Sequence, residues 1–134
     1  MPAIALDANG MCRLSFRDTV KVDIEPAQRP GHIHIYTALA RIPANADAAW
    51  YRTLQEANLF GRDTGFATTA CDPTTEEVLL CQLLDLENLS IERFDLLLQD
   101  FVQSAATLQQ RLLRITPQAK PDDMPMDIMN AMRV

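Results

Sequence analysis

The chain has 134 residues, of which 48% are hydrophobic and 22% are charged, and its formal net charge is −6 at pH 7. These proportions are typical of one globular domain of ordinary size. The acidic balance argues against a nucleic acid partner, because phosphate binding requires clustered Lys and Arg. The apolar runs are far shorter than the roughly 20 residues that cross a bilayer, and the amino end lacks a secretory signal. We therefore expect no membrane association and a cytoplasmic location.

The first 40 residues alternate between apolar and polar side chains, a period of two that is typical of strands. The alternating runs cover residues 3–6, 12–16, 19–24 and 32–36, and the last of them continues into the apolar segment 37–40. Asp7-Ala8-Asn9-Gly10 separates the first two runs with residues that tolerate positive φ. Pro26, Pro30 and Gly31 mark the loop before the last run. This pattern predicts an antiparallel meander of four strands.

A helix is predicted from about Ala48 to Phe60. Asp47 can cap its first turn, and Gly61 stands where a left-handed residue would end it. Trp50, Leu54 and Ala57 share one side, whereas Tyr51, Gln55 and Asn58 form a more polar flank.

A second hairpin is predicted after the turn at residues 61–65. One strand covers 66–71, the polar residues 72–75 form the turn, and the other strand covers 77–84. Residues 76–86 also have helical propensity, but the flanking turns and the short length favour a strand.

The strongest helix pattern begins after Ser90, a good capping residue. Its apolar side chains recur at steps of three and four: Phe94, Leu97, Leu98, Phe101, Ala105, Leu108 and Leu112. About 24 residues at 1.5 Å each are long enough to cross the whole sheet. We therefore expect one domain over 1–114, with this helix packed on the sheet.

Residues 115–134 are predicted to form a flexible tail, because three prolines and the pair Asp122-Asp123 disfavour a continued helix. The tail is nevertheless apolar near its end, where it carries Met124, Met126, Ile128, Met129 and Met132. Methionine is suited to adaptable contacts, so the tail is either a docking segment or a frayed terminus.

The sequence offers little that could support catalysis or cofactor binding. His32 and His34 would lie on the same face of a strand, which is half of a metal site without an evident third ligand. Cys12, Cys71 and Cys81 are widely spaced and odd in number, so we interpret them as reduced thiols. No phosphate-binding glycine motif is present, and we predict neither a cofactor, a metal nor an enzymatic activity.

The order of these elements, together with Leu54-Gln55-Glu56-Ala57-Asn58 and the Leu-rich strand before the last helix, resembles the class I type III secretion chaperones of the Tir chaperone family. The resemblance covers about residues 3–113. It implies an α+β fold, an antiparallel twisted sheet of about five to six strands with helices packed on it, in β-β-β-β-α-β-β-α order. The family pattern begins with a helix before the first strand, whereas this sequence is expected to begin at the strand. Either the native start lies upstream, or part of the apolar face of the sheet is left exposed.

The resemblance also implies a cytosolic homodimer that binds the amino-terminal region of a secreted effector or a secretion regulator. An unfolded client could add a strand to the sheet edge and bury apolar side chains in shallow pockets. The candidate client contacts come from the first hairpins, with at least one face of the set expected in the core: Ile4, Leu6, Leu14, Phe16, Val20 and Val22.

The family's dimer interface maps to the helix at 48–60 and the strand after it. The candidate residues are Trp50, Tyr51, Leu54, Asn58, Phe66 and Thr68, although Trp50 and Leu54 could equally be core residues. Two other functions remain open. One is a regulatory chaperone of the same fold that sequesters an anti-activator, which the final Ala-Met-Arg-Val favours. The other is a small α/β enzyme, which would need a deep polar pocket around His32 and His34.

Overall fold

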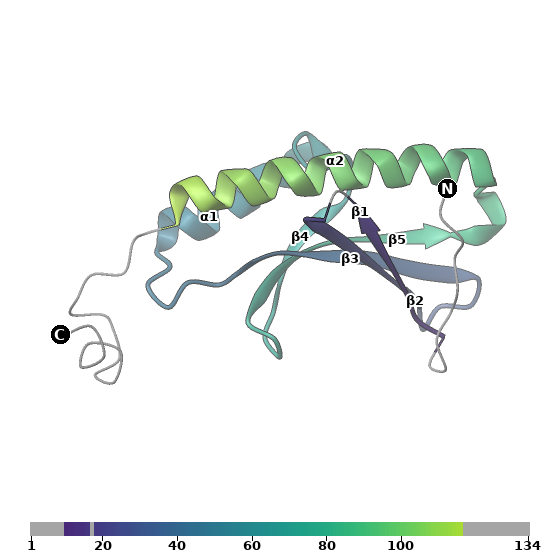
Figure 1. The fold of residues 1–134 in the computed structure, drawn as a ribbon, viewed down its shortest axis with the longest axis horizontal. Coiled ribbons are helices and arrows are strands. Elements are labelled where there is room, and N and C mark those ends of the chain that lie inside the picture. Colours follow the sequence, from purple (N-terminus) through teal and green to yellow (C-terminus); the bar gives the residue numbers. More distant parts are fainter. Residues whose placement is uncertain (1–9, 17, 117–134) are drawn as a thin grey trace.

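The computed structural model describes residues 10–16 and 18–116, which form a five-stranded antiparallel sheet and two helices (Figure 1). The strands are β1 (Cys12–Phe16), β2 (Val20–Pro26), β3 (His32–Arg41), β4 (Thr68–Asp72) and β5 (Glu77–Asp85). Helix α1 spans Ala48–Ala57 and α2 spans Ile91–Ile115, with short 3-10 turns at Leu59–Gly61 and Leu86–Asn88. The predicted α+β class is confirmed. The strand predicted at residues 3–6 lies outside the described residues.

The strands are ordered β1-β2-β3-β5-β4, so the two central neighbours, β3 and β5, are far apart in the sequence. β1, β2 and β3 form the predicted meander, and β4 and β5 form the predicted second hairpin. Most of the segment with helical propensity, residues 76–86, forms the strand β5 (Glu77–Asp85). It pairs with β3 along nearly its whole length, with one register shift between Ala38 and Ala40.

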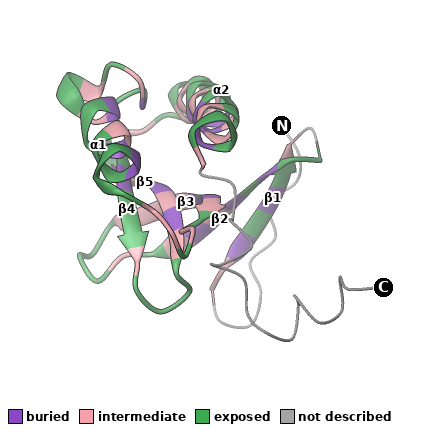
Figure 2. Ribbon diagram, turned by 90° about the vertical axis from the view of Figure 1, so that its left-hand side faces the viewer, coloured by how far each residue is buried: buried purple, intermediate pink, exposed green. Residues whose placement is uncertain are grey.

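Both helices pack on the same face of the sheet (Figures 1 and 2). Helix α2 crosses β2 and β3, whereas α1 lies beside it and contacts β4. The alternation of each strand therefore sends one set of side chains under the helices and the other set to the uncovered outer face. The largest fully buried side chains of the core are Trp50, Ile35, Leu80, Leu98, Leu108 and Leu112.

The helix starts agree with the capping signals in the sequence. The side chain of Asp47 accepts a hydrogen bond of 2.9 Å from the amide of Trp50, and Ser90 accepts one of 3.2 Å from the amide of Arg93. The 25 residues of α2 carry the predicted apolar stripe, of which Leu98, Phe101, Ala105, Leu108 and Leu112 are buried. The described part of the chain contains no helix with the length and apolar content needed to span a bilayer.

The segment between α1 and β4 differs from the prediction. The helix ends at Ala57 rather than at Phe60, and β4 begins at Thr68 rather than at Phe66. Phe60 (φ 53°) and Phe66 (φ 71°) both adopt the left-handed conformation, which neither a helix nor a strand accepts. Gly61 is left-handed, as predicted, and a Cβ there would lie 2.8 Å from the Cα of Phe66.

Candidate partner-binding surfaces

The predicted client contacts divide into buried, half-buried and undescribed residues. Leu14, Val20 and Val22 lie in the core on the inner face of β1 and β2, where the helices cover the sheet. Phe16 is half-buried against that core. Ile4 and Leu6 lie outside the described residues. Of the four described candidates, Phe16 alone has a partly exposed side chain, and client binding by this set stays a prediction.

Strand β1 forms one edge of the described sheet. It pairs with β2 from Cys12↔Ile24 to Phe16↔Val20, and within residues 10–16 and 18–116 it has no second neighbouring strand. A sheet edge presents backbone N–H and C=O groups that an extended peptide can pair with.

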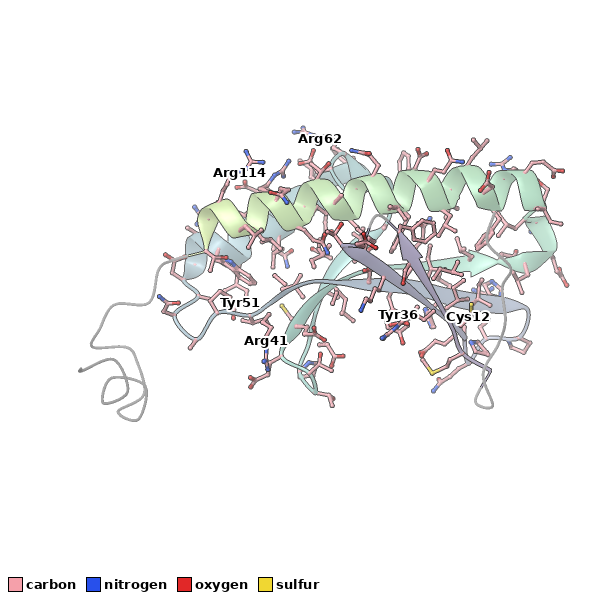
Figure 3. The ribbon with its side chains drawn as sticks, viewed as in Figure 1. Cys12, Tyr36, Arg41, Tyr51, Arg62 and Arg114 are labelled. Carbon is pink, nitrogen blue, oxygen red and sulfur yellow. The ribbon has the colours of Figure 1, made fainter. Side chains whose placement is uncertain are left out.

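On the outer face, polar side chains of β1, β2 and β3 form hydrogen bonds between neighbouring strands. Arg13 donates two hydrogen bonds to the carboxylate of Asp23, at 2.7 and 2.9 Å. Tyr36 donates its hydroxyl proton to Glu25 across 3.0 Å and projects from the uncovered face (Figure 3). Burial, together with this hydrogen bond to Glu25, raises the pKa of Tyr36 to about 12. The phenol is therefore a hydrogen-bond donor at neutral pH.

A hollow of about 480 Å³ lies on this outer face. Lys21, Tyr36 and Ala38 contribute to it from the meander, and Asp72, Glu77 and Leu79 contribute from the second hairpin. The lining of this hollow thus combines charged side chains of both signs with the apolar Ala38 and Leu79.

The predicted dimer residues also divide into core and surface. Trp50 is only 1% exposed and Leu54 is also buried, so both are core residues of the single chain. Asn58 joins α1 to β4: its side-chain oxygen accepts from the amide of Thr69 at 2.8 Å. Tyr51, Phe66 and Thr68 are exposed. Tyr51 packs edge-on against Trp50, with ring centroids 5.2 Å apart.

Two exposed residues close to this set were missed in the sequence. Phe60 is 83% exposed and Leu59 is about half exposed, in the turn that follows α1. Both were assigned to the predicted helix, where an apolar side chain is normally taken as core. The useful signal was the apolar pair immediately before Gly61, because a chain that leaves a helix at glycine turns away from the packed face.

A groove runs along the flank of α2 that faces residues 61–66. It consists of two adjoining hollows of about 350 and 580 Å³, which share Gly65, Phe66 and Asp100. The first is also lined by Arg62, Asp63 and Arg111, and the second by Leu89, Leu96 and Leu97. Phe66 is 81% exposed at the junction of the two hollows. We call this feature the α2 groove.

The histidine and cysteine side chains are not gathered into a reactive cluster. Ring atom Nδ1 of His32 lies 2.9 Å from the carbonyl oxygen of Pro30, and His34 lies beside Glu25 and Leu83 in the neighbouring strands. All three cysteines are free, and burial raises the pKa of the Cys81 thiol. In the described ranges no three His, Cys, Asp or Glu residues are grouped so that they could hold a metal ion.

The comparison with known proteins gives one family and a consistent set of folds. The model of the Tir chaperone protein (CesT) family matches residues 1–109. A search of curated protein sequences found no match.

Among solved structures, the chain resembles the ExsC-ExsE complex with a TM-score of 0.67 and 22% identity, covering 90% of this chain and 86% of the other. The HopA1-SchA chaperone-effector complex gives a TM-score of 0.64 at 11% identity, covering 82% and 83%. The Yersinia pestis type III secretion chaperone SycH, in complex with a fragment of YscM2, gives 0.61 at 18% identity, covering 81% and 87%. These likenesses confirm the fold.

Proposed function

Because the chain belongs to the Tir chaperone protein (CesT) family, we propose that it binds the amino-terminal region of a secreted effector and keeps it unfolded and competent for type III export from the cytosol. The observation that carries the proposal is the family match, which extends over residues 1–109 of 134. The role requires binding without chemistry, so the chain acts as a chaperone and not as an enzyme.

The solved structures support a protein partner for this fold. SchA was solved with the effector HopA1, and SycH was solved with a stable fragment of YscM2. We infer that the present chain likewise binds a segment of another protein.

Two features of the chain suit an extended, unfolded client. Among residues 10–16 and 18–116, β1 is an edge strand, and a sheet edge offers backbone pairing that makes little demand on client sequence. Phe16 at the end of β1 offers a half-buried apolar side chain next to that edge. Pairing provides affinity and apolar contacts provide selectivity, which is the division of roles known for strand addition.

We further propose that the chain forms a homodimer through the exposed surface of α1 and β4. Tyr51, Phe66 and Thr68 form the available part of this surface, and the buried Trp50 and Leu54 support it from beneath. In a twofold dimer the same patch is used on both subunits, so each exposed side chain contributes twice. Dimerisation would also double the client-binding surface for a segment that spans both subunits.

A second candidate function is a regulatory chaperone that sequesters an anti-activator or another regulator of secretion genes. The carboxyl-terminal Ala131-Met132-Arg133-Val134 resembles the ending of chaperones of this regulatory type, which keeps this candidate open. The two functions share the fold and differ in the partner.

The deciding experiment is purification of the tagged full chain from its own cells, followed by identification of bound proteins and measurement of the size of the complex. An exported protein bound through its amino-terminal region supports the effector chaperone, and a regulatory protein supports the second candidate. A monomer without any bound protein contradicts both. A His32→Ala, His34→Ala double variant should retain the same partner, whereas an enzyme centred on these histidines would lose activity.

A further inference from the structure

The α2 groove changes in chemical character along its length. The hollow near the carboxyl end of α2 carries charges of both signs. Arg111 is partly exposed and paired with Asp63 at 3.3 Å, and Asp100 also lines the hollow. Arg62 is exposed and has no ion-pair partner among the described residues. Arg114 follows Arg111 after about one turn of the helix, and Figure 3 shows Arg62 and Arg114 extending from the side of the molecule opposite the sheet. The exposed Arg62 would attract a carboxylate, although the protein as a whole carries a net charge of −6.

The second hollow of the groove is open and carries apolar side chains beside the polar Gln82, Asn88 and Arg93. Phe66 and Leu96 are 81% and 62% exposed, and the partly buried Leu89 and Leu97 lie beside them in the lining. The left-handed backbone of Phe66 presents its ring outward at a conformational cost that a non-glycine residue rarely accepts. Residues held in this way are candidates for a binding role.

One segment of the chain itself has the complementary order of charge and apolarity. Residues 117–134, which lie outside the described residues, begin just after α2 ends at Ile115. They carry the acidic pair Asp122-Asp123 first, and then the apolar residues Met124, Met126, Ile128 and Met129. A segment that turned back along α2 would bring its acidic pair to Arg62 and its methionines to the apolar side chains of the groove.

The chain lengths permit this path. At 1.5 Å of rise per residue, Arg111 lies about 6 Å and Leu97 about 27 Å before Ile115 along the helix. At about 3.3 Å per extended residue, Asp122 can reach about 23 Å from Ile115 and Met129 about 46 Å. The extended lengths to Asp122 and Met129 exceed the distances from Ile115 back to Arg111 and Leu97. Several residues therefore remain for the reversal of direction after α2.

We propose that residues 117–134 dock in the α2 groove of their own chain, with Asp122 and Asp123 beside Arg62 and Arg111, and with the methionines over Phe66. Methionine fills irregular apolar hollows without a fixed shape, which suits a groove made of two unequal parts. Docking covers Phe66, so the segment competes with any partner, including a second copy, that uses this ring.

Amide hydrogen exchange on the full chain tests this, because docking should protect residues 61–67. Their amides form long hydrogen bonds, such as 3.3 Å from Phe66 to Gly61 and 3.1 Å from Ala67 to Thr64, so they respond to a covering segment. Asp122→Arg with Asp123→Arg should accelerate exchange there several-fold, and Arg62→Glu alone should do the same. Combining all three substitutions should restore much of the protection.

The matched control is Arg29→Glu, which makes the same charge change at an exposed arginine outside the groove and should leave exchange at 61–67 unchanged. Met124→Ser with Met126→Ser should also accelerate exchange, which tests the apolar part separately. The proposal would be overturned if the wild type, the Asp122→Arg, Asp123→Arg variant and the Arg62→Glu variant exchanged at equal rates at residues 61–67. It would also be overturned if the variant with all three substitutions showed no recovery of protection there. Protection that rises with protein concentration and is unchanged in both reversal variants would assign the groove to a second copy and overturn docking within one chain.

Discussion

Asn58 and Thr69 join the end of α1 to the edge strand β4 through a pair of side-chain contacts. The amide of Thr69 donates to the side-chain oxygen of Asn58 at 2.8 Å, and the hydroxyl of Thr69 donates to the carbonyl of Leu54 at 3.1 Å. Thr69 is buried, so its amide depends on Asn58 for a partner. This connection fixes the left-handed turn that carries Phe60 and Phe66.

Replacing Asn58 with Ala should lower the free energy of unfolding by about 1–3 kcal/mol, because the buried amide of Thr69 then loses its acceptor. Gln55→Ala, at an exposed position one turn earlier on α1, should change it by less than about 0.5 kcal/mol. Urea unfolding of the two variants measures the difference. Equal midpoints would mean that water replaces Asn58 without cost.

Leu98 and Leu113 provide a second matched pair on α2. Leu98 is 2% exposed, whereas Leu113 is 69% exposed and lies outside the lining of the α2 groove. Leu98→Ala should destabilise the fold by about 2–5 kcal/mol, because it leaves a cavity in the core. Leu113→Ala should cost less than about 0.5 kcal/mol. Comparable losses in thermal or chemical unfolding would contradict this difference in burial.

The hydrogen bond from Tyr36 to Glu25 predicts a loss of stability at high pH. The pKa of Tyr36 is about 12 in the fold, above its ordinary value of 10, so the folded state favours the protonated phenol. This contribution is complete below pH 10 and is lost as the pH rises from 10 through 12.

Absorbance titration of the wild type, with the Tyr36→Phe variant subtracted, should show a phenolate transition near pH 12. The difference in stability between the two proteins should shrink over the same pH range. A subtracted transition at the ordinary value of 10 would contradict the shift.

The proposed dimer predicts a specific effect at Tyr51, which is exposed on α1. Tyr51→Asp would place a charge in the centre of a twofold contact, and each copy would add one, so the dissociation constant should rise at least tenfold, or about 1.4 kcal/mol. Tyr51→Phe keeps the ring and should leave the constant nearly unchanged. Sedimentation equilibrium measures both, and an unaltered Tyr51→Asp dimer would place the interface elsewhere.

The sequence predicted most elements because their periodicity is local. The apolar steps of α2 and the alternation of β1, β2 and β3 depend on near neighbours in the chain. The capping roles of Asp47 and Ser90 were predictable for the same reason, since each acts on the amide three residues later.

The candidate site was predicted less completely, because it depends on contacts between distant residues. Alternation places Leu14, Val20 and Val22 together on one face, but it does not say that α2 covers this face. Likewise, nothing in the local pattern shows that Asn58 binds Thr69, which lies 11 residues away and helps to leave Phe66 outside the strand. The α2 groove also joins residues from three separate segments, which no local pattern could combine.

The strand order has a consequence for how the chain acquires its fold. The meander β1-β2-β3 and the hairpin β4-β5 are each built from neighbours in sequence, but the central pairing of β3 with β5 requires closure of a loop from Arg41 to Glu77. Closure of such a loop costs entropy before the pairing compensates for it. We therefore expect two locally ordered halves whose docking at β3 and β5 limits the folding rate. Helix α2, the last of the described elements along the chain, can then pack on the inner face of the sheet when β3 and β5 pair.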